Sequence, residues 1–301
     1  MVWIALSVMA AAFQTLRFML QKTLSMGALS AGGATLARFL YTAPFACLLA
    51  AGYLAWRGQG LPEIGRAFWP YVLAGGLAQI LATWCVVAIF ASRNFAVGIT
   101  FKKTEVMLTA LVGFVVLGDT VTLGGLAAIG VGLIGVLVLS DIPEGAGGLL
   151  RRAMNRAAGL GLLSGVLFAV SAVTYRGATL DVASDDALTR ALVTIPCVTV
   201  SQTLGLGLWI AAKEPGQFTA VLRAWRTAVW MGLTGLGGSL GWFTAFTLMN
   251  AAYVFAVGQV EVIFSIVASV LFFGEKITKR EGVGMLFITI SVIGLVVLYR
   301  A

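Results

Sequence analysis

Long apolar runs alternate with short polar clusters along the whole chain. A helix that crosses the hydrocarbon core of a bilayer needs about 20 mostly apolar residues, and measured against that length the runs predict about ten spans. The expected spans are 2–20, 32–56, 69–91, 98–117, 121–139, 157–177, 187–212, 227–249, 254–273 and 282–299. The breaks between them hold turn-forming or charged residues, and none is long enough for a soluble domain. The pattern predicts an all-α, polytopic membrane protein.

The composition agrees with this fold class. Of the 301 residues, 60% are hydrophobic and 11% are charged, whereas an ordinary soluble domain is about 25% charged. The net charge of +8 is spread through the short loops. This distribution favours anionic lipid headgroups as the electrostatic partner. We therefore expect membrane lipids, and no nucleic acid, among the partners.

Several kinds of chemistry are excluded because the residue types they need are missing. The chain has no histidine, so imidazole proton relays and histidine-ligated metals are ruled out. Cys47, Cys85 and Cys197 lie in separate apolar runs without ligand spacing, and the sequence contains no phosphate-binding GxxxxGK[ST] loop. We expect no catalytic residue, no metal and no cofactor, and the protein is not predicted to be an enzyme.

The second half of the chain repeats features of the first half. Three positions recur 156 residues later, namely Asn94 as Asn250, Glu105 as Glu261 and Gly118 as Gly274. Each half holds five predicted spans, an odd number, so the second copy enters the membrane with the opposite orientation. We predict two inverted five-helix repeats, residues 1–140 and 157–301, joined by a connecting loop at 141–156. Inverted repeats of this kind place a substrate site near the midplane between the halves.

Each predicted repeat closes with the same order of features. A polar-anchored fourth span is followed by a Gly-acidic-x-x-Thr segment and a glycine-rich fifth span; the segments are Gly118-Asp119 to Thr122 and Gly274-Glu275 to Thr278. With this doubled architecture the chain resembles, over nearly its whole length, the EamA-type transporters of the drug/metabolite transporter superfamily. The resemblance implies a multi-pass protein of a bacterial-type inner membrane. It also implies a central cavity lined by the first, third and fourth spans of each repeat, with the fifth span peripheral.

The loop charges bear on the orientation in the membrane. With an even number of spans, both termini lie on one side. That side carries four cationic residues, Arg57, Arg66, Arg176 and Arg300. The other side carries eleven, Lys22, Arg93, Arg151, Arg152, Arg156, Lys213, Arg223, Arg226, Lys276, Lys279 and Arg280. The positive-inside rule then places the termini outside, whereas the family resemblance implies cytoplasmic termini.

Ionisable residues inside the spans point to function. Each costs about 2.5 to 3.5 kcal/mol on insertion scales, so each needs a partner, a wet cavity or a route to the headgroups. They are Arg17, Arg38, Lys102, Lys103, Glu105, Arg190 and Glu261. By their depth we predict the ion pairs Arg38–Glu105 and Arg190–Glu261 near opposite membrane faces. Such pairs act either as permanent structural contacts or as gates that open alternately.

The two repeats differ in charge. Lys102 and Lys103 correspond to the uncharged Gly258 and Gln259, so one half of the cavity has excess positive charge. Lys102 shares a helix face with Glu105, while Lys103 points to lipid headgroups or to another helix. An unbalanced cation suits a carboxylate or phosphate on the substrate. The alternative is that the long lysine stems snorkel to the headgroups.

Polar and aromatic side chains inside the spans complete the candidate substrate site. The candidates are Gln14, Arg17, Gln79, Trp84, Lys102, Glu105, Tyr175, Trp242, Gln259 and Glu261. The fifth and tenth spans are almost entirely apolar and rich in glycine, which permits close helix contact. We expect them to serve as scaffold, or as the surface of a homodimer.

Together these features predict a secondary transporter, and within that class an exporter, of a small polar or amphipathic metabolite. The expected cargo is amino-acid-like or an organic anion, moved by alternating access between the inverted repeats. Two alternatives stay open. One is an exporter of cationic drugs or metabolites that uses Glu105 and Glu261; the other is a membrane scaffold protein without cargo.

Overall fold

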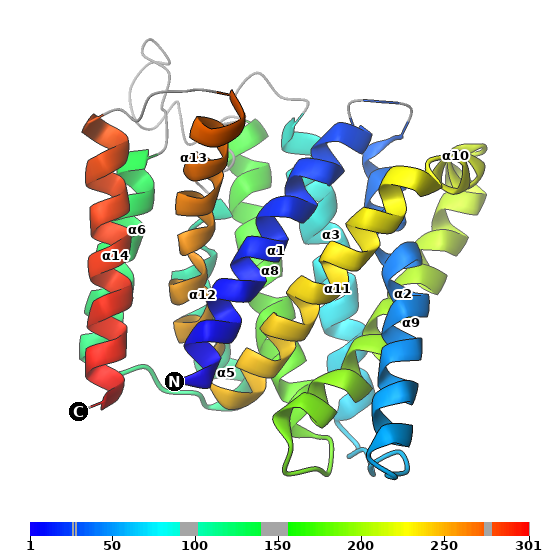
Figure 1. Cartoon of the computed structure of the whole chain (residues 1–301), viewed down its shortest axis with the longest axis horizontal. Coiled ribbons are helices and arrows are strands. Elements are labelled where there is room, and N and C mark those ends of the chain that lie inside the picture. Colours follow the sequence, from blue (N-terminus) through cyan, green and yellow to red (C-terminus); the bar gives the residue numbers. More distant parts are fainter. Residues whose placement is uncertain (26, 28, 91–101, 140–155, 274–278, 301) are drawn as a thin grey trace.

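A computed structural model describes residues 1–25, 27, 29–90, 102–139, 156–273 and 279–300 (Figure 1). Helices make up most of this part of the chain, and the described residues form no β-strand beyond one isolated bridge between Ile64 and Val182. The predicted all-α fold is confirmed. Five helices, α1, α2, α3, α8 and α9, are long and apolar enough to cross a membrane, and shorter apolar helices accompany them.

The helices of the first half are α1 (Val2–Ser25), α2 (Ala31–Trp56), α3 (Phe68–Phe90), α5 (Glu105–Leu117) and α6 (Leu123–Leu139). Those of the second half are α8 (Arg156–Leu180), α9 (Ala187–Lys213), α10 (Gln217–Arg223), α11 (Trp225–Leu248), α12 (Ala251–Gly258), α13 (Val260–Phe273) and α14 (Lys279–Arg300). Most predicted spans correspond to one helix each, because the apolar runs end where the turn-forming clusters begin. Some expectations lie outside the described residues: the start of the fourth span at 98–101, nearly all of the connecting loop 141–156, the segment Gly274-Glu275 to Thr278, and the loop charges Arg93, Arg151, Arg152 and Lys276.

The fourth span of each half differs from the prediction of one continuous helix. In the first half, Lys103 and Thr104 form a turn and α5 begins only at Glu105. In the second half, the expected helix 254–273 is two helices, α12 and α13, which meet at Gln259. The backbone N–H of Gln259 donates to the carbonyls of Ala256 and Val257, which ends α12. Glu105 and Glu261 therefore both lie in the first turn of a helix.

Equivalent helices of the two halves run in opposite directions. α2 and α9 show this directly, because the N-cap of each one contacts the C-terminal part of the other. Ser30, the N-cap of α2, donates from its hydroxyl to Glu214, the C-cap of α9. At the other end, Tyr53 near the end of α2 donates to Asp186, the N-cap of α9, over 2.9 Å. The two helices are thus fastened antiparallel at both ends.

Within the bundle, α1 packs along α11, α3 along α8 and α2 along α9, while α6 and α14 pack together at one edge (Figure 1). The α6–α14 contact is close because glycines line it. A Cβ atom placed on Gly135 would lie 2.8 Å from the carbonyl oxygen of Gly284. Ser291 of α14 also donates to the carbonyl of Ala128 of α6 over 2.6 Å. The fifth spans of the two halves, α6 and α14, therefore form a peripheral pair, and the polar side chains gather elsewhere.

Candidate functional site

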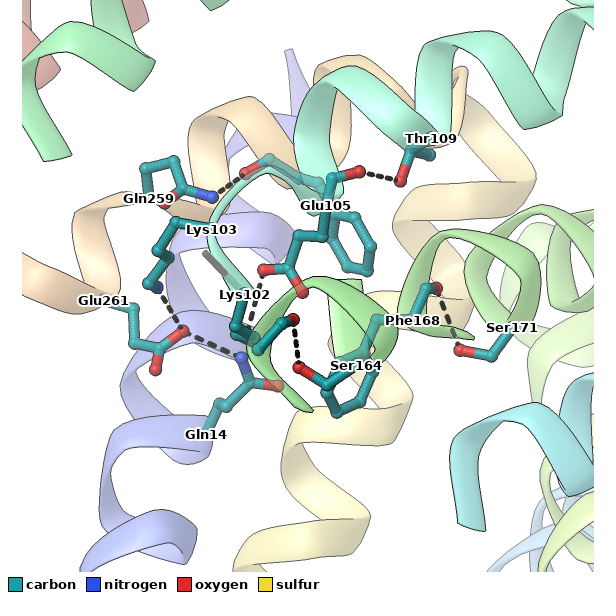
Figure 2. Close-up of polar contacts among 12 residues, drawn as sticks. Gln14, Lys102, Lys103, Glu105, Thr109, Ser164, Phe168, Ser171, Gln259 and Glu261 are labelled. Carbon is teal, nitrogen blue, oxygen red and sulfur yellow. Dashed lines mark hydrogen bonds and ion pairs between the residues drawn. The ribbon is translucent and has the colours of Figure 1, made fainter. Parts of the chain in front are cut away.

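The two broken fourth spans meet in the interior of the bundle, beside the middle of α1. Figure 2 shows the polar side chains that gather there. We call this group the central cluster; its members are Gln14, Lys102, Lys103, Glu105, Gln259 and Glu261. Four of them occupy equivalent positions of the two repeats, Glu105 with Glu261 and Lys103 with Gln259. The central cluster is therefore assembled where the halves contact each other, as expected for a site between repeats.

Two ion pairs organise the central cluster. Lys102 Nζ lies 2.9 Å from Glu105 Oε1, one helical turn along the chain. Lys103 Nζ lies 3.6 Å from Glu261 Oε2 and so joins the two halves. Gln14 of α1 donates to the same Glu261 oxygen over 2.8 Å. Because both carboxylates lie in the first turns of α5 and α13, the positive ends of the helix dipoles also stabilise their charges.

Aromatic rings enclose the central cluster. Lys102 Nζ lies 4.9 Å from the ring centroid of Phe168, a cation–π distance. Trp242 donates from its indole nitrogen to Gln14 over 3.2 Å. Its ring passes over Gly258, where an added Cβ atom would come within 2.5 Å of the indole. The space left between these groups is only about 20 Å³, which is room for about one water molecule. The structure is thus closed around the cluster.

The predicted ion pairs Arg38–Glu105 and Arg190–Glu261 are not formed among the described residues. Their depth was inferred from unbroken helices, whereas α5 begins at Glu105 and α13 just before Glu261. Each carboxylate is met instead by one of the two lysines just before α5, Lys102 or Lys103. Arg190 lies in the first turn of α9, where it donates to the carbonyl of Ser184.

The lysines do not snorkel to the membrane surface. Lys102 and Lys103 are 3% and 5% exposed, and both ammonium groups face carboxylates. Lys102 is therefore balanced by Glu105, which corrects the expectation that it is the unbalanced cation. Two polar atoms in the cluster nevertheless lack a hydrogen-bond partner among the described residues: Lys103 Nζ and Gln259 Oε1.

Two buried arginines lie close together without an ion-pair partner among the described residues. Arg17 of α1 and Arg38 of α2 are 2% and 7% exposed, and their stems lie side by side against α11. A Cβ atom placed on Gly235 would be 3.7 Å from Arg17 Cδ and 3.9 Å from Arg38 Cγ. Arg17 donates to Gln21 over 2.9 Å, and Arg38 donates to Thr83 over 3.2 Å. Neither forms an ion pair with a carboxylate in the described part of the chain.

A third polar group links α3, α8 and α9. Tyr175 donates to Gln79 Oε1 over 3.2 Å, and Gln202 donates to the same oxygen over 3.0 Å. Tyr175 also stacks on Phe243, with ring centroids 4.6 Å apart. Gln202 was missed from the sequence, although an amide inside the apolar run 187–212 was a usable signal. The third aromatic candidate, Trp84, points away from these groups and contacts Trp209 on the outer side of α3.

Arg176 joins several segments at one end of the bundle, the end where the chain termini lie. The sequence did not indicate this role. Its guanidinium lies 2.9 Å from Asp119, the acidic residue of the Gly-acidic-x-x-Thr segment. It also donates to the backbone carbonyls of Phe246 and Met249 at the end of α11. One side chain thus joins the α5–α6 turn, α8 and the α11–α12 junction.

Comparisons with known proteins agree on the class of this architecture. The sequence model of the EamA-like transporter family matches residues 155–297. A Sinorhizobium protein named "Uncharacterized transporter in cobO 3'region" is 30% identical over 131 residues, which are 42% of this chain and 86% of that protein. A solved structure titled "Crystal structure of protein" superposes with a TM-score of 0.69 at 15% identity, covering 98% of this chain and 99% of the other. At that identity the structural likeness concerns the fold alone.

Proposed function

Because the chain belongs to the EamA-like transporter family and is a membrane transporter of the drug/metabolite kind, we propose that it carries a small organic anion. The cargo has a carboxylate and includes amino-acid-like anions. It crosses the membrane by secondary transport, with alternating access between the inverted repeats. The observation that carries this proposal is the pair of buried arginines, Arg17 and Arg38, without a carboxylate partner in the described part of the chain.

The charge of the interior supports an anionic cargo. Each buried ionisable group costs about 2.5 to 3.5 kcal/mol on insertion scales, and such groups in membrane helices mark substrate pathways. The carboxylates of the central cluster already face Lys102 and Lys103. The two neighbouring guanidinium groups therefore add positive charge that no ion pair among the described residues balances. A carboxylate supplies the missing charge and accepts the two parallel N–H bonds that a guanidinium offers.

The central cluster supports a site that changes between two states. Lys103 and Gln259 each have a buried polar atom without a hydrogen-bond partner among the described residues. An unsatisfied buried group costs about 1 to 3 kcal/mol, so a conformation or a ligand that satisfies them is favoured. Discontinuous helices whose N-termini face the site are a recurring way for transporters to hold charged cargo. The Lys103–Glu261 pair crosses between the halves and is the contact that we expect to break when they separate.

The test is thermal unfolding of the purified protein in lipid nanodiscs with succinate, benzoate, glutamate and the cation agmatine. A ligand at 100 times its Kd stabilises the folded state by about 2.7 kcal/mol. We expect the anions to raise Tm in the wild type, and Arg17→Gln or Arg38→Gln to abolish the rise. The matched control is Arg223→Gln, which removes an exposed arginine at the end of α10. In this variant the anions should still raise Tm. Uptake of the radiolabelled anion into proteoliposomes must fail in the same two variants.

The stability of the ligand-free variants provides a second readout. Removing a buried charge that has no carboxylate partner in the described part of the chain relieves a desolvation cost, so Arg17→Gln and Arg38→Gln should unfold at the same or a higher temperature than the wild type. A large loss of stability would instead mean that the arginines hold the fold together. A Tm shift with agmatine alone would replace the anion with a cation bound by Glu105 and Glu261. If no compound shifts Tm, the scaffold alternative gains.

A further inference from the structure

A groove of about 530 Å³ lies on the outer side of the bundle, between α3 and α9. Its volume falls within the range of about 300 to 1,000 Å³ that small-molecule sites occupy. The wall on α3 is formed by Leu73, Leu77 and Leu81, which are 56%, 59% and 41% exposed and face the lipid. At one end Trp84 and Trp209 meet edge to face, with ring centroids 4.9 Å apart.

The groove exists because glycines replace side chains on both walls. Gly76 of α3 and Gly205 of α9 line it. A Cβ atom placed on Gly205 would meet no atom within 4 Å, so the missing side chain leaves open space. From Leu73 to Trp84 the groove follows α3 for about 16 Å, at 1.5 Å per residue. It is long enough for an extended alkyl chain.

One polar side chain separates the groove from the interior. Gln202 is 2% exposed, and it lines both the groove and a small cavity of about 10 Å³ that Arg38 also lines. Its amide nitrogen donates to the carbonyl of Gly76 over 3.1 Å and to Gln79 over 3.0 Å. Its carbonyl oxygen has no hydrogen-bond partner among the described residues. The side chain that lies between the lipid-facing groove and Arg38 is thus Gln202, whose buried carbonyl oxygen accepts no hydrogen bond from the described residues.

We propose that this groove binds the apolar chain of an amphipathic carboxylic acid that enters from the bilayer with its carboxyl group directed at Gln202 and Arg38. In its protonated form the carboxyl group donates to Gln202 Oε1, and in its ionised form it complements the charge of Arg38. A phospholipid acyl chain fills the same space but offers no donor to Gln202. The inference rests on the proposed transport of organic anions and names, within them, a membrane-partitioned class.

The test uses bromoundecanoic acid, because bromine quenches the fluorescence of a tryptophan it contacts. The protein is held in nanodiscs, and quenching is compared between the wild type and the Trp84→Phe/Trp209→Phe double variant. We expect saturable quenching in the wild type that depends on these two tryptophans. Bromoundecanol, a neutral molecule with the same chain, should bind at least tenfold more weakly, because it carries no charge for Arg38.

Filling the groove should abolish binding. Gly205→Leu occupies the open space on α9, and its matched control is Gly52→Leu, because Gly52 of α2 is also exposed with no atom within 4 Å of an added Cβ. We expect the apparent affinity for bromoundecanoic acid to fall at least tenfold in Gly205→Leu and to stay unchanged in Gly52→Leu. Leu77→Phe fills the groove from the opposite wall without adding a tryptophan, and must give the same loss if Gly205→Leu fails to fold.

The outcomes separate this inference from the proposed function. Equal quenching by acid and alcohol, or undiminished quenching in the filled variants, would overturn the inference. Saturating quenching by brominated phosphatidylcholine that the acid cannot displace would assign the groove to a structural lipid and overturn it as well. If succinate or benzoate still raises Tm through Arg38 in those cases, the proposed function stands without the groove. If no anion of either kind binds, the proposed function fails.

Discussion

At the residue scale, Asp186 fixes where α9 begins and how it is held. Its carboxylate accepts hydrogen bonds from the backbone amides of Leu188 and Thr189, from the Thr189 hydroxyl and from Tyr53 of α2. Three of these groups belong to the first turn of α9, where amides have no partner within the helix. One side chain thus caps a helix and attaches it to its antiparallel partner.

We expect Asp186→Ala to lower the free energy of unfolding by about 1 kcal/mol, the usual effect of removing an N-cap. Asp186→Asn should keep most of that stability, because asparagine is also a good N-cap. The control is Asp185→Ala, which removes the exposed neighbouring carboxylate. The measurement is the Tm of the purified protein in nanodiscs at neutral pH. Equal Tm values for the three variants would contradict the capping role.

Asp186 also predicts a dependence of stability on pH. Burial raises the pKa of its carboxyl group, but the hydrogen bonds from Thr189, Tyr53 and the two backbone amides outweigh burial, so the pKa is lowered overall. A carboxylate whose pKa is lower in the folded than in the unfolded state stabilises the fold above its unfolded pKa of about 3.9, and that contribution disappears as the pH falls further. The Tm difference between wild type and Asp186→Asn should therefore shrink as the pH falls below about 4.

The sequence identified which polar residues lie inside the bundle but not which ones meet. Lys102, Glu105 and Glu261 were singled out because charges in apolar runs are rare and costly. Their partners depend on where the fourth spans break. Because of the break, Lys103 contacts Glu261 of the other half, and Glu105 does not reach Arg38. The role of Gln202 could not be inferred because its partners, Gln79 and Tyr175, come from distant spans.

At the scale of helices, α6 and α14 form a pair through direct backbone approach. A Cβ atom placed on Gly135 would lie 2.8 Å from the Gly284 carbonyl and 3.0 Å from the Ile288 amide nitrogen. These neighbours are backbone atoms, so they cannot rotate away. Gly130, about one turn earlier on the same helix, would meet nothing within 4 Å. The two glycines provide a matched pair for testing the contact.

We expect Gly135→Val to separate α6 from α14 and to cost about 1 to 3 kcal/mol of stability, as overpacking of a close contact does. Gly130→Val should change stability by less than about 0.5 kcal/mol, because the added side chain points into open space. Tm in nanodiscs measures both effects. Equal losses of stability in the two variants would show that the helix propensity of valine, and not the α6–α14 contact, determines the effect.

Helix positions were predictable because a bilayer demands a fixed length of apolar sequence. The predicted span 69–91 corresponds to α3 at Phe68–Phe90, and 187–212 corresponds to α9 at Ala187–Lys213. Hydropathy could not reveal the break between α12 and α13, since the residues on both sides of Gln259 are apolar. At the break Glu261 contacts Gln14 and Lys103 of the other half, and those contacts are not local in sequence.

At the scale of the whole molecule, the distribution of cationic side chains distinguishes the two ends. The end that holds the chain termini carries Arg57 and Arg66 in the turn between α2 and α3. Two further arginines at this end are bound within the protein, Arg176 to Asp119 and Arg190 to the carbonyl of Ser184. The opposite end carries Lys213, Arg223, Arg226, Lys279 and Arg280 among the described residues. Cytoplasmic loops retain lysine and arginine because these charges resist translocation. The structure therefore places these five cationic residues at one end of the bundle, where α9 ends and α11 begins; we call it the α9–α11 end.

We predict that this surface is cytoplasmic and that the termini face outward. The measurement is labelling of single cysteines in whole cells by a membrane-impermeant maleimide, with the native cysteines changed to serine. Gln59→Cys, in the exposed turn after α2, should react in intact cells, whereas Arg223→Cys should react only after lysis. The reverse pattern would show that the orientation implied by the family resemblance prevails over the loop charges. In that case the arginine pair, which lies nearer the α9–α11 end, would receive its cargo from outside.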